Sequence, residues 1–166
     1  YKSSPQIELS GIFSLNTSYP LTKIEKNYQS FLIPKSSLRI NPGDMINYSN
    51  LNRRINTGNI FNLNRFGFTD TFEAGKSLTL GLDYKREKIE NLQNINNYFE
   101  MKIATVIRDK EENFLPNTTT LNKKNSNVFG SLRKNFSDNF QIGYDFAIDD
   151  SLNTFEYNNL NTTLMY

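Results

Sequence analysis

The segment from Phe140 to Asp149, FQIGYDFAID, alternates large apolar side chains with polar or small ones along its whole length. Successive side chains of a β-strand point to opposite faces of a sheet, so this alternation predicts a strand with one apolar and one polar face. The same period recurs in at least six other segments, whose polar positions are often charged. Such strands are typical of the wall of a membrane β-barrel around an aqueous interior.

The alternating segments are separated by polar connections of unequal length. Two connections, 41–70 and 108–127, are long, whereas the turns at 137–139 and 150–153 are short, and a polar stretch separates residues 19 and 31. Antiparallel connections alternate between the two ends of a sheet, and both long ones fall at the same end, as the extracellular loops of outer-membrane barrels do. The predicted strands span 6–19, 31–40, 71–86, 97–107, 128–136 and 140–149, and a last strand ends at 166.

We therefore predict an all-β chain, an antiparallel up-and-down sheet that forms a segment of a transmembrane β-barrel. Its strands are longer than the usual five or six residues and suit a tilted crossing of a bilayer. About seven strands do not close a bacterial barrel, which has an even number. We expect residues 1–166 to be one partial barrel domain of a larger outer-membrane barrel, with no second domain and with open edges that disfavour folding alone.

The composition excludes several kinds of chemistry. The 166 residues contain no cysteine, histidine or tryptophan, so disulfides, thiol nucleophiles and histidine-ligated metals are impossible within them. No apolar run approaches the roughly 20 residues of a transmembrane helix. The net charge of +2 is too small to indicate nucleic-acid binding. We expect no enzymatic activity, no cofactor and no nucleic-acid partner.

A more specific pattern lies in the long connection and the strand after it. Residues 59–75 read NIFNLNRFGFTDTFEAG and lead into LTLGLDY at 78–84. This segment resembles the barrels of the LPS-assembly protein LptD family, also called organic solvent tolerance proteins. Those barrels carry an aromatic-Asn/Asp-Arg-hydrophobic-Gly segment that leads through Glu-x-Gly into a strand. The resemblance continues in family order from Phe31 to Tyr166, through LIP at 32–34, LRINP at 38–42, SNVFGSL at 126–132 and FSDNF at 136–140.

The resemblance implies a Gram-negative outer-membrane protein that assembles lipopolysaccharide (LPS) in the outer leaflet. In that family the sugar chain passes through the lumen and the lipid leaves between the first and last strands. The implied partners are LPS, outer-membrane lipid, a plug lipoprotein of the LptE type and the periplasmic components of the LPS bridge. The periplasmic jellyroll, the barrel-closing strands and the cysteines of the family are not in this sequence. We therefore expect barrel wall and extracellular loops, without the gate.

Two groups of residues are candidates for function. The first comes from the family-like segment and is expected to form a loop in the lumen: Asn59, Phe61, Asn64, Arg65, Phe66, Gly67, Glu73 and Gly75. The second comprises apolar strand positions that are expected to contact lipid: Leu78, Leu80, Leu82, Phe140, Ile142, Tyr144, Phe146 and Ile148. The alternate positions Gln141, Asp145 and Asp149 are expected to face the lumen.

The arginines of the long connection have two interpretations. Arg53, Arg54 and Arg65 could bind sugar or phosphate, because the guanidinium fork matches anions. For Arg65 we favour a structural role, in which hydrogen bonds to a carboxylate such as Glu73 fold the connection into the lumen.

Two other classes of protein share the alternating pattern. A passive porin or another outer-membrane channel differs from the LPS translocon mainly in lacking the pattern at 59–75. A soluble β-sandwich binding module also needs only one buried face per strand. Strand length argues against the sandwich.

Overall fold

A computed structural model of the chain describes residues 11–89 and 97–165. These residues form one antiparallel sheet and a single short 3-10 helix, η1 (Asn117–Thr119), which confirms the predicted all-β class. Within the described ranges there is no helix long and apolar enough to span a membrane. The strands are β1 (Phe13–Ser18), β2 (Leu21–Ile24), β3 (Tyr28–Asn41), β4 (Gly75–Lys88), β5 (Tyr98–Arg108), β6 (Val128–Ser137), β7 (Phe140–Ile148) and β8 (Phe155–Leu164).

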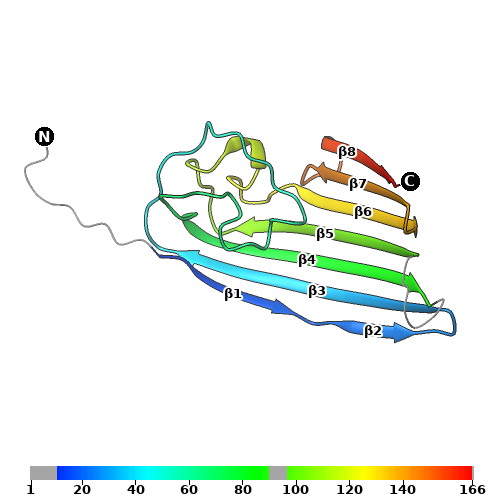
Figure 1. Ribbon diagram of the computed structural model, residues 1–166. Helices are drawn as coiled ribbons and strands as arrows, with labels where there is room; N and C mark the ends of the chain where they lie inside the picture. Colours follow the sequence, from blue (N-terminus) through cyan, green and yellow to red (C-terminus); the bar gives the residue numbers. More distant parts are fainter. Residues whose placement is uncertain (1–10, 90–96, 166) are drawn as a thin grey trace, which may run out of the picture.

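The strands run up and down in sequence order across the sheet (Figure 1). Their spatial order is β1, β3, β4, β5, β6, β7 and β8, and β2 also pairs with β3. Among the described residues, neither β8 nor the edge formed by β1 and β2 has a further strand beside it, so the sheet is open. Figure 1 shows the two long loops gathered over one end of this sheet.

The sequence prediction fails at β2, which lies in the stretch expected to be a polar connection. β1 and β2 pair with β3 in one continuous register, from Phe13 opposite Ile40 to Ile24 opposite Gln29. The break between them falls where Pro20 and Pro34 lack the backbone N–H that a ladder needs. Because β1 and β2 share one row, the eight strands form seven rows, in agreement with the predicted number.

The other predicted strands are present, with shifted ends. β4 begins at Gly75 rather than Thr71, because residues 71–74 belong to the loop, where Thr71 and Glu73 are buried. The long loops span 42–74 and 109–127 and lie at the same end of the sheet. The predicted strand positions 6–10 and Tyr166 lie outside the described residues.

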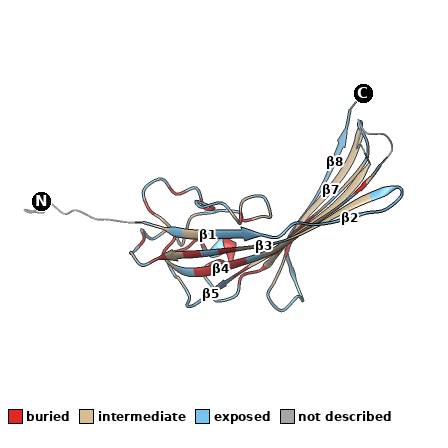
Figure 2. Cartoon of the chain, turned by 90° about the horizontal axis from the view of Figure 1, so that it is seen from below, coloured by how far each residue is buried: buried red, intermediate tan, exposed pale blue. Residues whose placement is uncertain are grey.

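The hydrophobic core lies between the two long loops and one face of the sheet. Figure 2 shows the buried residues concentrated at the loop end, whereas β2 and β8 are almost entirely exposed. The loops contribute Met45, Ile55, Ile60, Phe66, Phe68, Ala74, Leu115 and Leu121, and the sheet contributes Ala104, Val106, Phe129 and Ala147.

Candidate functional site

The face of the sheet beneath the loops, which we call the inner face, is mainly polar, although Ala104, Val106, Phe129 and Ala147 form an apolar patch on it under the loops. All acidic side chains of β3 to β7 are on it, as the alternation of the strands requires: Asp83, Glu87, Glu100 and Asp145. At the loop end its polar side chains are buried, including Ser37, Arg39, Thr79 and Ser131. The 42–74 loop is fixed to it by hydrogen bonds from Thr57 to Ser131 (Oγ1 to Oγ, 3.0 Å) and from the Tyr157 hydroxyl to the carbonyl of Ile55 (3.0 Å).

The opposite face, which we call the outer face, is apolar. Leu78 and Leu80 are 36% and 40% exposed, whereas the intervening inner-face residues Ser77 and Thr79 are 4% and 0% exposed. The residues predicted to contact lipid share the outer face through the register of the strands, and no described loop covers them. They are Leu78, Leu80 and Leu82 on β4, and Phe140, Ile142, Tyr144, Phe146 and Ile148 on β7.

Phe146 also fills a gap in the outer face. It lies directly opposite Gly130 of β6, and a Cβ added to that glycine would fall 2.1 Å from the ring. The ring makes a further edge contact with Phe155, at 6.1 Å between centroids. Gly130 is therefore required by the position of the Phe146 ring rather than by backbone conformation.

Three arginines surround one carboxylate on the inner face, in what we call the Arg–Glu cluster: Arg39, Arg65, Arg108 and Glu73. Arg65 binds Glu73 at two points, with Nε to Oε2 at 2.8 Å and a second, shorter bond from Nη2 to Oε1. Arg108 donates to the same Oε1 and to the carbonyl of Ala74. All four side chains are at least 94% buried. The predicted hydrogen bonds between Arg65 and Glu73 are thus confirmed.

Arg39 connects the cluster to the tip of the 42–74 loop. Its Nη2 donates to the carbonyls of Asn62 (2.8 Å) and Ile60 (3.4 Å), and its Nη1 donates to Thr79 Oγ1 (3.0 Å). Arg65 Nη1 donates to the same hydroxyl oxygen at 3.1 Å. The cluster therefore ties the middle of the loop to β3 and β4 through charged donors, which form stronger hydrogen bonds than neutral ones.

The charges of the cluster determine the ionisation of Glu73. Burial on its own would raise the pKa of this carboxyl, but the positive charges of Arg65, Arg108 and Arg39, together with the Arg65 hydrogen bonds, hold the pKa below its usual value. Glu73 is therefore ionised at neutral pH and is the one carboxylate that contacts these guanidinium groups among the described residues. An uncompensated carboxylate at this depth would be costly.

Each remaining candidate residue of the family-like segment has a structural contact. The Asn64 side-chain amide donates to the backbone carbonyl of Phe68 and accepts a hydrogen bond from the backbone N–H of the same residue, which closes a turn. Gly67 within this turn has φ +68°, a conformation that favours glycine. Phe66 is buried and stacks on Phe68 at 5.1 Å between centroids. Asn59 donates to the carbonyl of Arg54 and accepts from the backbone of Asn56.

Two glycines of β4 give room to neighbouring side chains, one from the loop and one from β5. Gly81 of β4 lies under the Phe61 ring, and an added Cβ would be 2.7 Å from Phe61 Cζ. Gly75 has φ +83°, and an added Cβ would be 2.9 Å from Arg108 Nη2. The segment from Asn59 to Gly75 is thus the part of the loop that is fitted to the inner face.

The other candidates are placed differently. Arg54 lies over the Tyr157 ring, with its guanidinium carbon 3.8 Å from the centroid, and Arg53 is exposed on the loop. Gln141 and Asp145 lie on the inner face, as predicted. Asp149 does not, because β7 ends at Ile148 and the Asp149 carboxylate caps the following turn. Hydrogen bonds from the backbone N–H groups of Thr154 and Asn153 lower the pKa of Asp149.

Basic residues on the outer face lie only near its two ends. Along β4 they are Lys76 at the loop end, and Arg86 and Lys88 at the other, with Leu78, Leu80, Leu82 and Tyr84 between them. At about 3.4 Å per residue, Lys76 and Arg86 are about 34 Å apart along the strand. A strand tilted by about 40° would make this band about 26 Å tall, close to the ~25 Å apolar band of outer-membrane barrels.

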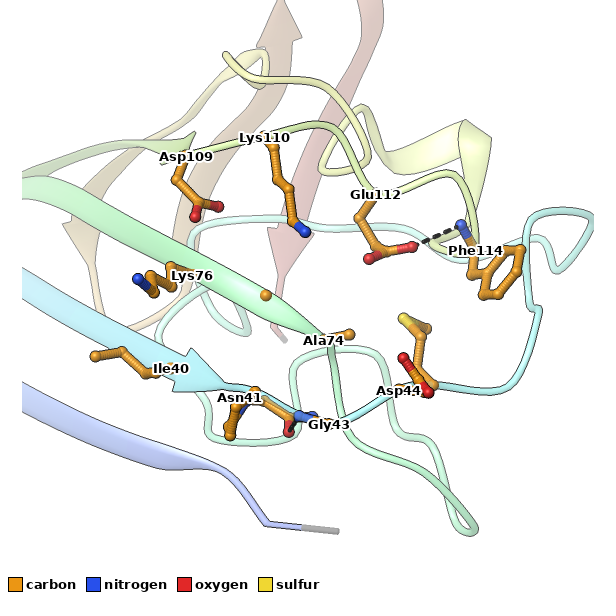
Figure 3. Close-up of a pocket in the computed structure, with 13 residues that line it drawn as sticks. Ile40, Asn41, Gly43, Asp44, Ala74, Lys76, Asp109, Lys110, Glu112 and Phe114 are labelled. Atoms are coloured by element: carbon orange, nitrogen blue, oxygen red, sulfur yellow. Dashed lines mark hydrogen bonds between the residues drawn. The ribbon is translucent and has the colours of Figure 1, made fainter.

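A hollow of about 340 Å³ opens beside the loop end of β3 and β4 (Figure 3). Its charged groups have both signs, Lys76 and Lys110 against Asp44, Asp109 and Glu112. Glu112 accepts a hydrogen bond from the backbone of Phe114 at 3.2 Å. The described ranges contain no group of three acidic side chains placed to hold a metal ion. The mixed charges assign no ligand to this hollow.

Sequence reasoning missed Arg39 and Arg108 as members of the Arg–Glu cluster, and Ser77 and Thr79 as the hydroxyl partners of its arginines. The available signal is their position. Arg39 and Arg108 are charged residues on the polar phase of β3 and β5, immediately before the long loops begin. Comparisons of the chain with family models, curated proteins and solved structures find no match.

Proposed function

We propose that this chain forms part of the wall and the extracellular loops of an outer-membrane β-barrel that assembles LPS in the outer leaflet of Gram-negative bacteria. The observation that carries the proposal is the inversion of the two faces. A half-buried sheet in a water-soluble protein covers its apolar face and exposes its polar one. In this chain the loops cover the mainly polar face, including the strand residues Arg39 and Thr79, and leave Leu78 and Leu80 bare.

A bilayer accounts for this inversion, because hydrocarbon solvates an apolar outer face while the polar inner face lines an aqueous lumen. The ~26 Å band between Lys76 and Arg86 supports the same environment. The open edges at β8 and at β1 and β2 would then pair with further strands of the barrel, since an unpaired edge is not tolerated in lipid.

The LPS part of the proposal rests on the resemblance of residues 59–84 to the LptD family. The residues that carry the resemblance are the ones that fit the loop to the inner face, Arg65 and Glu73 above all. In this proposal the loop lies in the lumen and shapes the route of the sugar chain. The partners are LPS, outer-membrane lipid, a plug lipoprotein and the periplasmic LPS bridge.

Depletion of the protein in its host separates an LPS translocon from a passive porin. The measurement is surface-accessible LPS on intact cells, normalised to total cellular LPS, during conditional depletion. We expect the surface fraction to fall and to return when the wild-type protein is restored. An unchanged surface fraction with reduced uptake of small solutes would contradict LPS assembly and support the porin.

A further inference from the structure

We propose that the outer face binds the phosphate of an anionic glycerophospholipid at its short-turn end, in a hollow between Lys23 and Arg86. The proposal rests on the proposed function, because it takes the outer face to be in contact with lipid. It adds a specific lipid site with a headgroup preference, which a generic lipid-facing wall would not have.

The register of three strands builds this hollow. Lys23 of β2 lies opposite Ser30 of β3, and Ser30 lies opposite Arg86 of β4, so two cations flank a small hydroxyl in one row of the outer face. The hollow has a volume of about 420 Å³. A lysine ammonium and a guanidinium fork on either side of a hydroxyl donor match the oxygens of one phosphate.

The next row provides an apolar wall for the rest of the lipid. Leu21 pairs with Leu32, and Leu32 pairs with Tyr84, so three apolar side chains continue the hollow toward the middle of the outer face. A phosphate at Ser30 would therefore place acyl chains along Leu21 and Leu32. This order, from charge to hydrocarbon, is the order of groups in a glycerophospholipid.

The charge pattern of the outer face selects an anion. The sequences and register of β3 to β7 place no acidic side chain on the outer face. The basic side chains of these strands on that face lie near its two ends. At the hollow the Arg86 guanidinium lies over the Tyr28 ring at 4.3 Å, and farther along the same end of the sheet, on β6, the Lys134 ammonium lies 5.5 Å from the Phe136 ring. Basic and aromatic side chains together are typical of the headgroup level of a bilayer.

One acidic residue borders the hollow, and it supplies a directional test. Glu25, in the turn after β2, lies 2.6 Å from Lys23 and 3.4 Å from Arg86. All three side chains are substantially exposed, so this contact is open to competition. A bound phosphate would compete with the Glu25 carboxylate for the same two cations. Removal of the carboxylate should therefore strengthen binding.

The test is native mass spectrometry of the intact protein that carries this chain, in detergent with equimolar phosphatidylglycerol and phosphatidylcholine. We expect the wild type to retain phosphatidylglycerol preferentially. Each surface charge changes such binding by about fivefold. The double variant Lys23→Gln with Arg86→Gln should lower the preference by up to about 25-fold, and Glu25→Gln should raise it by about fivefold. The inner-face double variant Lys102→Gln with Arg133→Gln removes the same charge and should leave the preference unchanged.

Four outcomes overturn the inference. They are equal retention of both lipids by the wild type, no loss in the double variant, an equal loss in the inner-face control, and stronger retention of added LPS than of phosphatidylglycerol at Lys23 and Arg86. In each of these the protein still takes up detergent and lipid, so the proposed barrel wall stands. A protein that stays monodisperse without detergent and takes up no lipid contradicts the proposed function itself. Circular dichroism and heat-dependent gel mobility verify that each variant is folded.

Discussion

Arg65 and Glu73 form a two-point ion pair, buried between the 42–74 loop and the inner face of the sheet, with Nε to Oε2 at 2.8 Å. The two residues are close in sequence, so the pair closes a compact turn of the loop. Arg108 joins the pair from β5 and Arg39 lies beside it on β3. Arg65 also donates to Thr79 on β4, so the pair and its neighbours attach the loop to β3, β4 and β5.

Loss of Glu73 should be more damaging than loss of any single arginine of the cluster. Glu73→Gln leaves three buried guanidinium groups without a carboxylate, whereas Arg65→Leu leaves Glu73 still paired with Arg108. Removing one partner of a buried ion pair costs about 3–5 kcal/mol. We expect Glu73→Gln at the upper end of that range and Arg65→Leu at the lower end, measured by urea unfolding of the intact protein. Arg53→Gln, at an exposed arginine of the same loop, should change stability by less than about 0.5 kcal/mol.

The attachment of the loop should weaken at acidic pH. The pKa of Glu73 is lower in the folded state than its ordinary value of 4.5, so the unfolded loop takes up a proton first as pH falls. The stabilisation is complete above about pH 4.5 and is lost as pH falls through the folded-state pKa. Cleavage of the loop by an acid-stable protease should therefore increase only below about pH 4.5. In Glu73→Gln the cleavage should be fast at neutral pH already, with a weaker dependence on pH.

A methyl group at residue 81 should destabilise the protein by displacing Phe61. The added Cβ of Gly81→Ala would be 2.7 Å from Phe61 Cζ and 3.1 Å from the carbonyl oxygen of Ile103. Overpacking of this kind costs about 1–3 kcal/mol. A double-mutant cycle with Phe61→Ala measures the coupling. If the two substitutions are simply additive, the Phe61 ring does not lie over Gly81.

A carboxylate on the outer face should be more damaging than a phenyl ring on the inner face. We expect Phe146→Asp to destabilise the protein more than Asp145→Phe does, because a charge facing hydrocarbon is penalised. Phe146→Ala is the matched control for the contact with Gly130, so the excess cost of the aspartate over the alanine reports the environment. Refolding yield and urea unfolding in lipid vesicles measure both. Equal tolerance of aspartate at 146 and phenylalanine at 145 would contradict the assignment of the two faces.

The period of two was sufficient to predict the strands and the chemistry of their faces. It placed Phe140, Ile142 and Tyr144 together on one side and Gln141 and Asp145 on the other, because strand alternation is independent of what covers each face. The two long connections could be predicted because the alternation of apolar and polar residues stops at 41–70 and at 108–127. The break at Pro20 hid β2, since a proline in the ladder ends the pattern without ending the pairing.

The Arg–Glu cluster could be predicted only in part. The pairing of Arg65 with Glu73 follows from their nearness in sequence. The participation of Arg39 and Arg108 depends on the order of the strands, which brings residues more than thirty positions from Glu73 to one place. The contacts of Phe61 with Gly81 and of Phe146 with Gly130 also depend on register. Local sequence specifies a small residue there but not the ring that covers it.

The sidedness of the sheet is tested most directly by single cysteines introduced into the protein, because this chain contains none. In outer membranes, and in a background without other cysteines, Leu80→Cys and Ile142→Cys report the outer face, and Asp83→Cys and Asp145→Cys report the inner face. We expect a spin label at 80 and 142 to be relaxed by oxygen dissolved in lipid, and a label at 83 and 145 by a water-soluble nickel chelate. Relaxation of the outer-face labels by the chelate, with the inner-face labels shielded from it, would contradict the barrel wall.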